Sequence, residues 1–201
     1  MNSLYNAPLI KFLLLCVFII QPPCVYAHKV KALTLQQLAA QSDIVALVEI
    51  EASREIKKEK FSCGFEYTAR AVNILKGKTD ERFKFGYMQG LQPGRQYLIF
   101  LVDSRSFLYV NINVFKEYPG LMALIECKKI QPEKYTLAQG GSAFFEIETS
   151  SIFDHRPVIS IERQHLKVSK GMKYVNDRHN TSLIWITLDD ALGAVNEPAL
   201  R

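Results

Sequence analysis

The sequence predicts a mainly β protein organised around the stretch from Tyr67 to Val102. This stretch holds three β-type segments separated by turn residues, namely residues 67–75, 83–88 and 97–102. Gly77 ends the first segment, and Pro93-Gly94 sets a tight turn before the last one. Residues 97–102 are apolar at every position, so neither face suits water, and we expect them to form the buried centre of a sheet.

A change of phase in the first segment indicates a strongly bent strand. Its apolar side chains fall on one parity up to Ala71 and on the other parity from Val72, which continues with Ile74. A β-bulge at Ala71-Val72 would let both sets face the core. Small barrels require bent strands of this kind.

A short helix precedes this stretch. Thr34 followed three residues later by Gln37 is a capping-box pattern, and Leu35, Leu38 and Ala39 share one helical face. Asp43 then opens a strand expected over residues 44–52.

Further β-type segments follow the central stretch. Residues 107–115 alternate between apolar and polar side chains, as a half-exposed strand does, and residues 121–127 form another strand candidate. Thr187 is placed to cap a final helix, because acidic residues fill the first turn after it. Three shorter strands are expected between these points, over residues 143–149, 158–161 and 183–186.

The sequence resembles a known family at two places. One is the strand that begins at Tyr67 and ends in Leu-Lys-Gly, with the Gly/Pro turn that leads into Tyr97-Leu-Ile-Phe-Leu. The other is the helix over residues 33–39, followed by Ser42-Asp43-Ile44-Val45. Together they resemble the secreted OB-fold domains related to the tissue inhibitors of metalloproteinases and the netrin module, in their bacterial members. The resemblance implies a five-stranded OB-like barrel over residues 28–130, with residues 131–201 as a C-terminal β/α extension packed on it.

Residues 1–27 are expected to be a secretory signal peptide. Lys11 supplies its positive charge, residues 12–20 are apolar, and Pro22-Pro23 precedes a cleavage site after Ala27. A membrane anchor is the rival interpretation, but the apolar run is far shorter than the ~20 residues that cross a bilayer. We therefore expect a periplasmic or secreted protein without a membrane span.

Cleavage would leave two cysteines, Cys63 and Cys127, in an oxidising compartment. Two cysteines in an exported chain most often pair, so we expect a disulfide between them. The bridge would close a loop over residues 63–127, for which the chain-entropy estimate is about 4 kcal/mol. A nucleophilic cysteine is the weaker alternative, because no motif supplies a base for it.

Charge and motifs narrow the possible functions. The formal net charge is +5, and the densest basic cluster, residues 57–60, contains its own acid, which does not suit nucleic-acid binding. No metal-binding, phosphate-binding or hydrolase motif occurs around the histidines or glycines. We therefore expect no cofactor and no enzymatic activity. The histidines are His28, His155, His165 and His179.

These observations favour an exported binding or protein-interaction module whose partner is an unknown protein or envelope ligand. OB barrels bind along one sheet face, so Tyr109, Asn111 and Asn113, on the polar parity of residues 107–115, are candidate ligand contacts. The resemblance offers a protease inhibitor as the alternative, although the family's N-terminal zinc-chelating cysteine is missing. A metal-binding protein that uses His28 as the mature N-terminus is a third hypothesis.

Overall fold

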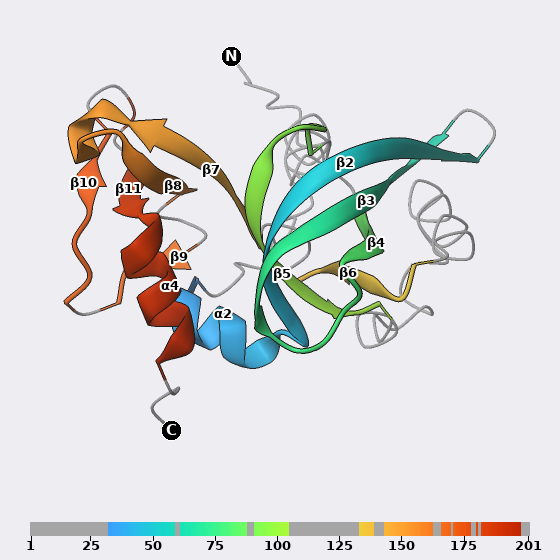
Figure 1. Cartoon of the computed structure of the whole chain (residues 1–201), viewed down its shortest axis with the longest axis horizontal. Coiled ribbons are helices and arrows are strands. Elements are labelled where there is room, and N and C mark those ends of the chain that lie inside the picture. Colours follow the sequence, from blue (N-terminus) through green and yellow to red (C-terminus); the bar gives the residue numbers. More distant parts are fainter. Residues whose placement is uncertain are drawn as a thin grey trace, which may run out of the picture. The chain divides into compact units, whose positions relative to one another are not determined.

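In the described residues, the helices α2 and α4 and a large set of strands make up the computed structural model (Figure 1). The model describes residues 32–58, 61–87, 91–104, 133–138, 143–162, 166–169, 171–177, 180 and 182–197. Its elements are β1 (Leu33–Thr34), α2 (Leu35–Gln41), β2 (Ile44–Lys58), β3 (Phe61–Lys76), β4 (Arg82–Tyr87), β5 (Gln96–Asp103), β6 (Tyr135–Leu137), β7 (Phe144–Ser150), η4 (Ser151–Phe153), β8 (Arg156–Glu162), β9 (Leu166–Lys167), β10 (Val175–Asn176), β11 (Leu183–Thr187) and α4 (Leu188–Asn196). The mainly β fold expected from the sequence is confirmed.

The first helix, α2, begins at the predicted capping box. The Thr34 side chain accepts a hydrogen bond from the backbone N–H of Gln37 (3.1 Å), and the Gln37 side chain accepts one from the N–H of Thr34 (3.1 Å). At the other end, Lys76 Nζ donates to the carbonyl oxygens of Ala39 (2.7 Å) and Ala40 (3.1 Å). A cation at the helix C-terminus complements its unpaired carbonyl groups, and it ties α2 to the end of β3.

Strand β5 occupies the centre of the structure, as residues 97–102 predicted. Its side chains from Tyr97 to Leu101 are all buried. Leu98 and Phe100 point to one hydrophobic cluster, whereas Tyr97, Ile99 and Leu101 point to another. The strand is therefore buried on both faces, and each face serves a different core.

Five strands close a ring around the second of these clusters. The pairings run β2–β3, β3–β4, β4–β6, β6–β5 and β5–β2, and all are antiparallel except β4–β6. The β4–β6 contact is the narrowest, with the single parallel pair Gly86 and Thr136 and a hydrogen bond from Thr136 Oγ1 to the Gly86 carbonyl (3.0 Å). We call the cluster inside the ring the ring core; its buried members are Ile44, Ala46, Val48, Ile50, Tyr67, Ala69, Phe85, Leu91, Tyr97, Ile99, Leu101 and Leu137.

The ring completes itself later in the chain than the sequence suggested. Its last strand, β6, lies beyond residue 130, in the part that we assigned to the C-terminal extension. The strand candidates over residues 107–115 and 121–127 lie outside the described residues.

The predicted bulge in β3 is confirmed, but the expectation that it turns both apolar sets of the strand toward the core was wrong. Leu47 pairs with Asn73 and the next residue of β2 pairs with Ala71, so Val72 is the extra residue. Val72 is 50% exposed and Ile74 38%, so neither joins the core. The reason is that β4 pairs with β3 only up to Arg70, and these two side chains lie beyond that pairing.

Two glycines allow the turns on either side of the ring strands. Gly77, at the end of β3, has φ +82°, and a Cβ there would lie 2.3 Å from the carbonyl oxygen of Asp43. Gly94 has φ +80°, and its N–H donates to the Ile50 carbonyl (2.7 Å), which ties the predicted Pro-Gly turn to β2.

The remaining strands extend the sheet from the edge of β5 that β6 also uses, since β7 pairs with residues 97–99 of β5 and β6 with residues 101–103. β7 pairs with β5, and β8, β11 and β10 follow in that order, all antiparallel. The predicted strands over residues 143–149, 158–161 and 183–186 thus become β7, β8 and β11. Thr187 caps α4 as expected, accepting a hydrogen bond from the N–H of Asp190 (3.2 Å).

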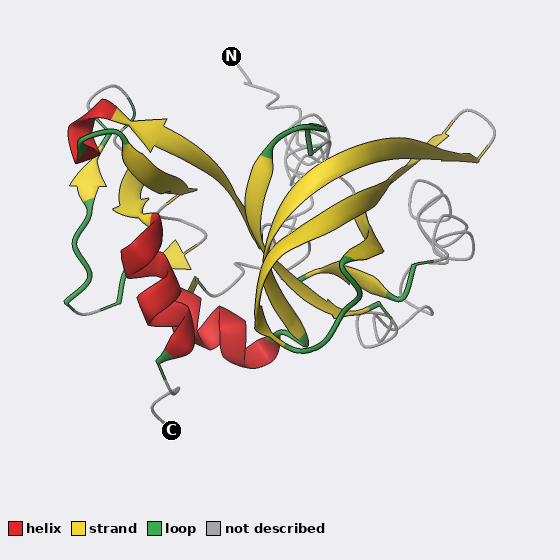
Figure 2. Ribbon diagram, viewed as in Figure 1, coloured by secondary structure: helices red, strands yellow, loops and turns green. Residues whose placement is uncertain are grey.

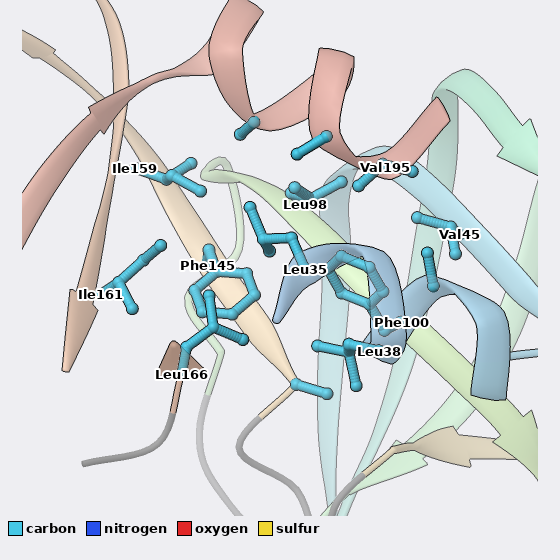
Figure 3. Packing of buried hydrophobic residues seen from close by; sticks show 14 of the residues in the cluster. Leu35, Leu38, Val45, Leu98, Phe100, Phe145, Ile159, Ile161, Leu166 and Val195 are labelled. Carbon is cyan, nitrogen blue, oxygen red and sulfur yellow. The ribbon is translucent and has the colours of Figure 1, made fainter. Parts of the chain in front are cut away.

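Both helices cover one face of this extension (Figure 2). Side chains from α2, α4, β5, β7 and β8 meet in a second cluster, which we call the helix-side core (Figure 3). Phe100 of β5 and Phe145 of β7 pack there edge to face, with ring centroids 5.9 Å apart. The helix-side core therefore depends on the strand that also lines the ring.

Replacing Phe100 with alanine should remove one of the largest fully buried side chains and leave a cavity between β5 and β7. We expect the free energy of unfolding to fall by about 3–5 kcal/mol. Val72→Ala, at the exposed bulge, is the matched control and should change stability by less than about 0.5 kcal/mol. Urea unfolding followed by circular dichroism measures both, and equal effects of the two variants would contradict this packing.

Candidate functional site

The ligand contacts predicted from sequence lie outside the described residues. This applies to Tyr109, Asn111 and Asn113, and equally to His28. Cys63 lies in β3 with its side chain fully buried, whereas Cys127 lies outside the described residues, so their pairing stays a prediction.

Charged side chains cover the outside of the ring over β2, β3 and β4. Along β3, Glu66, Thr68 and Arg70 alternate with the ring-core residues Tyr67 and Ala69, so they point away from the core. The strand register sets them in rows with charged neighbours on β2 and β4. We call this surface the outer charged face; its members are Glu49, Glu51, Arg54, Glu66, Arg70, Arg82 and Lys84.

One group of ion pairs lies where Glu49, Arg70 and Arg82 share a row across the three strands. Arg70 Nη2 lies 2.6 Å from a carboxylate oxygen of Glu49, and Arg82 Nε lies 3.1 Å from one of Glu51. Arg70 Nε also approaches Glu51 at 3.7 Å. Two arginines thus share two glutamates across neighbouring strands.

A second group is centred on Glu66. Arg54 Nη2 from β2 lies 3.0 Å from one of its carboxylate oxygens, and Lys84 Nζ from β4 lies 3.1 Å from the other. The Glu66 side chain is only 8% exposed, whereas those of Arg54 and Lys84 are 71% and 50% exposed. The carboxylate is therefore shielded from solvent, whereas the two cationic side chains are exposed to it.

A second carboxyl group, that of Glu133, interacts with Glu66 next to the narrow β4–β6 contact. Gly86 lies next to it, and a Cβ on Gly86 would be in ordinary contact with the Cβ of Glu133, at 4.0 Å. Burial, followed by the hydrogen bond to Glu66, raises the pKa of Glu133 above 4.5. Burial also acts to raise the pKa of Glu66, but hydrogen bonds with Lys84, Glu133 and Arg54 outweigh it and hold that pKa below 4.5. Of the two carboxyl groups, Glu133 is therefore the one that binds a proton more readily.

Two buried tyrosine hydroxyls hold the turn that precedes β5. Tyr67 Oη accepts a hydrogen bond from the N–H of Leu91 (2.9 Å), and Tyr97 Oη accepts one from the N–H of Gln92 (3.1 Å). Burial raises the pKa of both hydroxyls. Because both serve backbone groups, their role is to hold the turn rather than to perform chemistry.

Metal-binding geometry was not found in the described part of the chain, where no three His, Cys, Asp or Glu side chains gather as ligands. His155 lies in a turn after Asp154, with both residues at positive φ, and its side chain is exposed. Among these same residues, no helix is long and apolar enough to span a membrane.

Comparisons with family models, curated proteins and solved structures found no match to this chain.

The outer charged face was missed by the sequence analysis. The alternation of Glu49 and Glu51 in β2 was visible in the sequence, as was the polar parity of β4 with Arg82 and Lys84. Their pairing depends on the register between strands, which the bulges in β2 and β3 shift. Pairing Lys58 with Phe61 and counting back along both strands would have placed Arg70 opposite Glu49, because the register shifts at Glu55/Lys57 and Ile50/Ala52 cancel.

The raised pKa of Glu133 predicts a pH-dependent stability. Because the pKa of Glu133 is raised on folding, its contribution is complete below about pH 4.5 and is lost as the pH rises through the raised pKa. The contribution of Glu66, whose pKa is lowered, is already complete above about pH 4.5 and is lost only as the pH falls through the lowered pKa. Of these two carboxyl groups, only Glu133 therefore contributes to a change in stability when the pH rises from about 5 to about 8.

Glu133→Gln should remove this dependence, since the amide is always neutral and still donates to Glu66. We expect the free energy of unfolding of the variant to fall less than that of the wild type over this range, as measured by urea unfolding at each pH. Glu148→Gln, at an exposed position of β7, is the control and should follow the wild type. A Glu133→Gln profile parallel to the wild type would refute the raised pKa of Glu133.

Proposed function

We propose that the protein is an exported, non-enzymatic binding module built on an OB-like barrel, and that it binds its partner with the outer charged face. The order of the strands supports the barrel. The chain makes the hairpins β2–β3 and β3–β4, moves to β5 on the other side of β2, and then inserts β6 between β4 and β5. This strand order is the one expected of the five-stranded Greek-key barrel of an OB fold, and it supports the proposal.

The observation that carries the proposal is the position of the charges within that order. OB barrels bind along the face of their second and third strands. In this chain those strands are β3 and β4, whose outward side chains include Arg70, Arg82 and Lys84. The face that the barrel architecture assigns to ligands is therefore the face that bears exposed cations.

Tyr109, Asn111 and Asn113 fit the same proposal through their place in the sequence. OB barrels add the connections between strands one and two and between strands four and five to the binding surface. Tyr109, Asn111 and Asn113 lie in the sequence between β5 and β6, the fourth and fifth strands of the ring. They keep their place as predicted contacts.

The test is a comparison of two double variants in affinity capture from an envelope extract. Arg82→Ser with Lys84→Ser removes two exposed cations from β4, and both positions are on the surface, so the fold should persist. Arg156→Ser with Lys167→Ser removes two exposed cations from β8 and β9.

We expect the wild type and the β8/β9 variant to retain the same partner, identified by mass spectrometry, and the β4 variant to lose it. Circular dichroism confirms that each variant is folded. Retention of that partner by the β4 variant would overturn the proposal that this face binds.

A further inference from the structure

We infer that the partner of the outer charged face is an acidic protein segment in extended conformation, with carboxylates at alternate residues. This inference rests on the proposed function, and it adds the chemical class of the partner. It is argued from the direction of the ion pairs, the spacing of the cations and the position of the acids.

In every ion pair on this face, the acidic side chain is less exposed to solvent than the basic one. The pair of Arg82 and Glu51 has side chains 69% and 27% exposed, and the closest pair, Arg70 and Glu49, has 40% and 32%. A guanidinium group has five N–H donors, and each arginine here uses only some of them on its glutamates. Donors therefore remain for an acceptor that arrives from solvent.

The cations repeat at the spacing of an extended chain. Arg82 and Lys84 are two residues apart on β4, which separates them by about 7 Å. Alternate side chains of any extended peptide have the same separation. A peptide lying along β4 would therefore set carboxylates at residues i and i+2 against Arg82 and Lys84 together.

The acids on the face argue against a densely charged polymer. Four cations, Arg54, Arg70, Arg82 and Lys84, are interspersed with Glu49, Glu51 and Glu66. A nucleic acid or a sulfated polysaccharide carries anions close together, and some of them would meet these carboxylates at a cost. A strand in which neutral residues separate the carboxylates avoids that repulsion.

The experiment uses two heptapeptides of equal charge and composition, Thr-Glu-Thr-Glu-Thr-Glu-Thr and Glu-Glu-Glu-Thr-Thr-Thr-Thr. Each is titrated into the ¹⁵N-labelled protein at low salt, and the backbone amide shifts are followed by NMR, which also detects weak binding. We expect the alternating peptide to bind about tenfold more tightly than the clustered one, with shifts concentrated on β3 and β4.

Variants test whether the charges of β4 cause the binding. Arg82→Glu with Lys84→Glu should abolish binding of the alternating glutamate peptide and create binding of its lysine counterpart. Arg156→Glu with Lys167→Glu, away from the face, should leave the glutamate peptide's affinity unchanged. If the charge reversal impairs folding, Arg82→Gln with Lys84→Gln provides the same test with a smaller perturbation.

Three outcomes would overturn the inference: equal affinity for the two peptides, shifts located elsewhere, or tighter binding of a sulfated polysaccharide than of the alternating peptide. The capture experiment distinguishes a wrong partner class from a wrong binding face. If the β4 serine variant loses its envelope partner while the alternating peptide does not bind, the face is a binding site for a ligand of another class.

Discussion

Five consecutive buried side chains, Tyr97 to Leu101 of β5, join the two halves of this structure. Alternate members line the ring core and the helix-side core, so neither core is complete without the strand. An extended segment that is apolar on both faces is stable only when both faces are covered. The ring covers one face, and the sheet of β7, β8 and β11 with its two helices covers the other, which makes the C-terminal strands part of the structure that buries β5.

One surface of the ring contributes no side chains to either core. β2 and β5 contribute side chains to both cores. The outward side chains of β3 between Phe65 and Arg70, and those of the β4 residues that pair with them, belong to neither core. That surface carries charges in cross-strand pairs, and an exposed pair such as Arg82 and Glu51 adds little to stability, typically about 0–1 kcal/mol. The outer charged face is the surface that we propose as the binding site.

The parts of the fold that the sequence predicted are those with local causes. The capping box at Thr34 and Gln37, the bulge at Ala71-Val72 and the turn at Gly94 are each set by neighbouring residues, and the burial of β5 follows from an unbroken apolar run. Contacts between distant strands could not be predicted in this way. β6 has three residues and no distinctive pattern, and the ion pairs of Glu66 depend on strand register. The exposure of Val72 and Ile74 depends on where β4 stops.

The central claim is that β5 couples the two cores into one cooperative unit. Native-state hydrogen exchange, measured amide by amide at low denaturant concentrations, tests it most directly because it gives a free energy of opening for each strand. The account predicts that protected amides of β3 in the ring and of β8 and β11 in the extension open with the same free energy as those of β5, equal to that of global unfolding. Amides of β8 and β11 that open at a clearly lower free energy than those of β3 and β5 would contradict it.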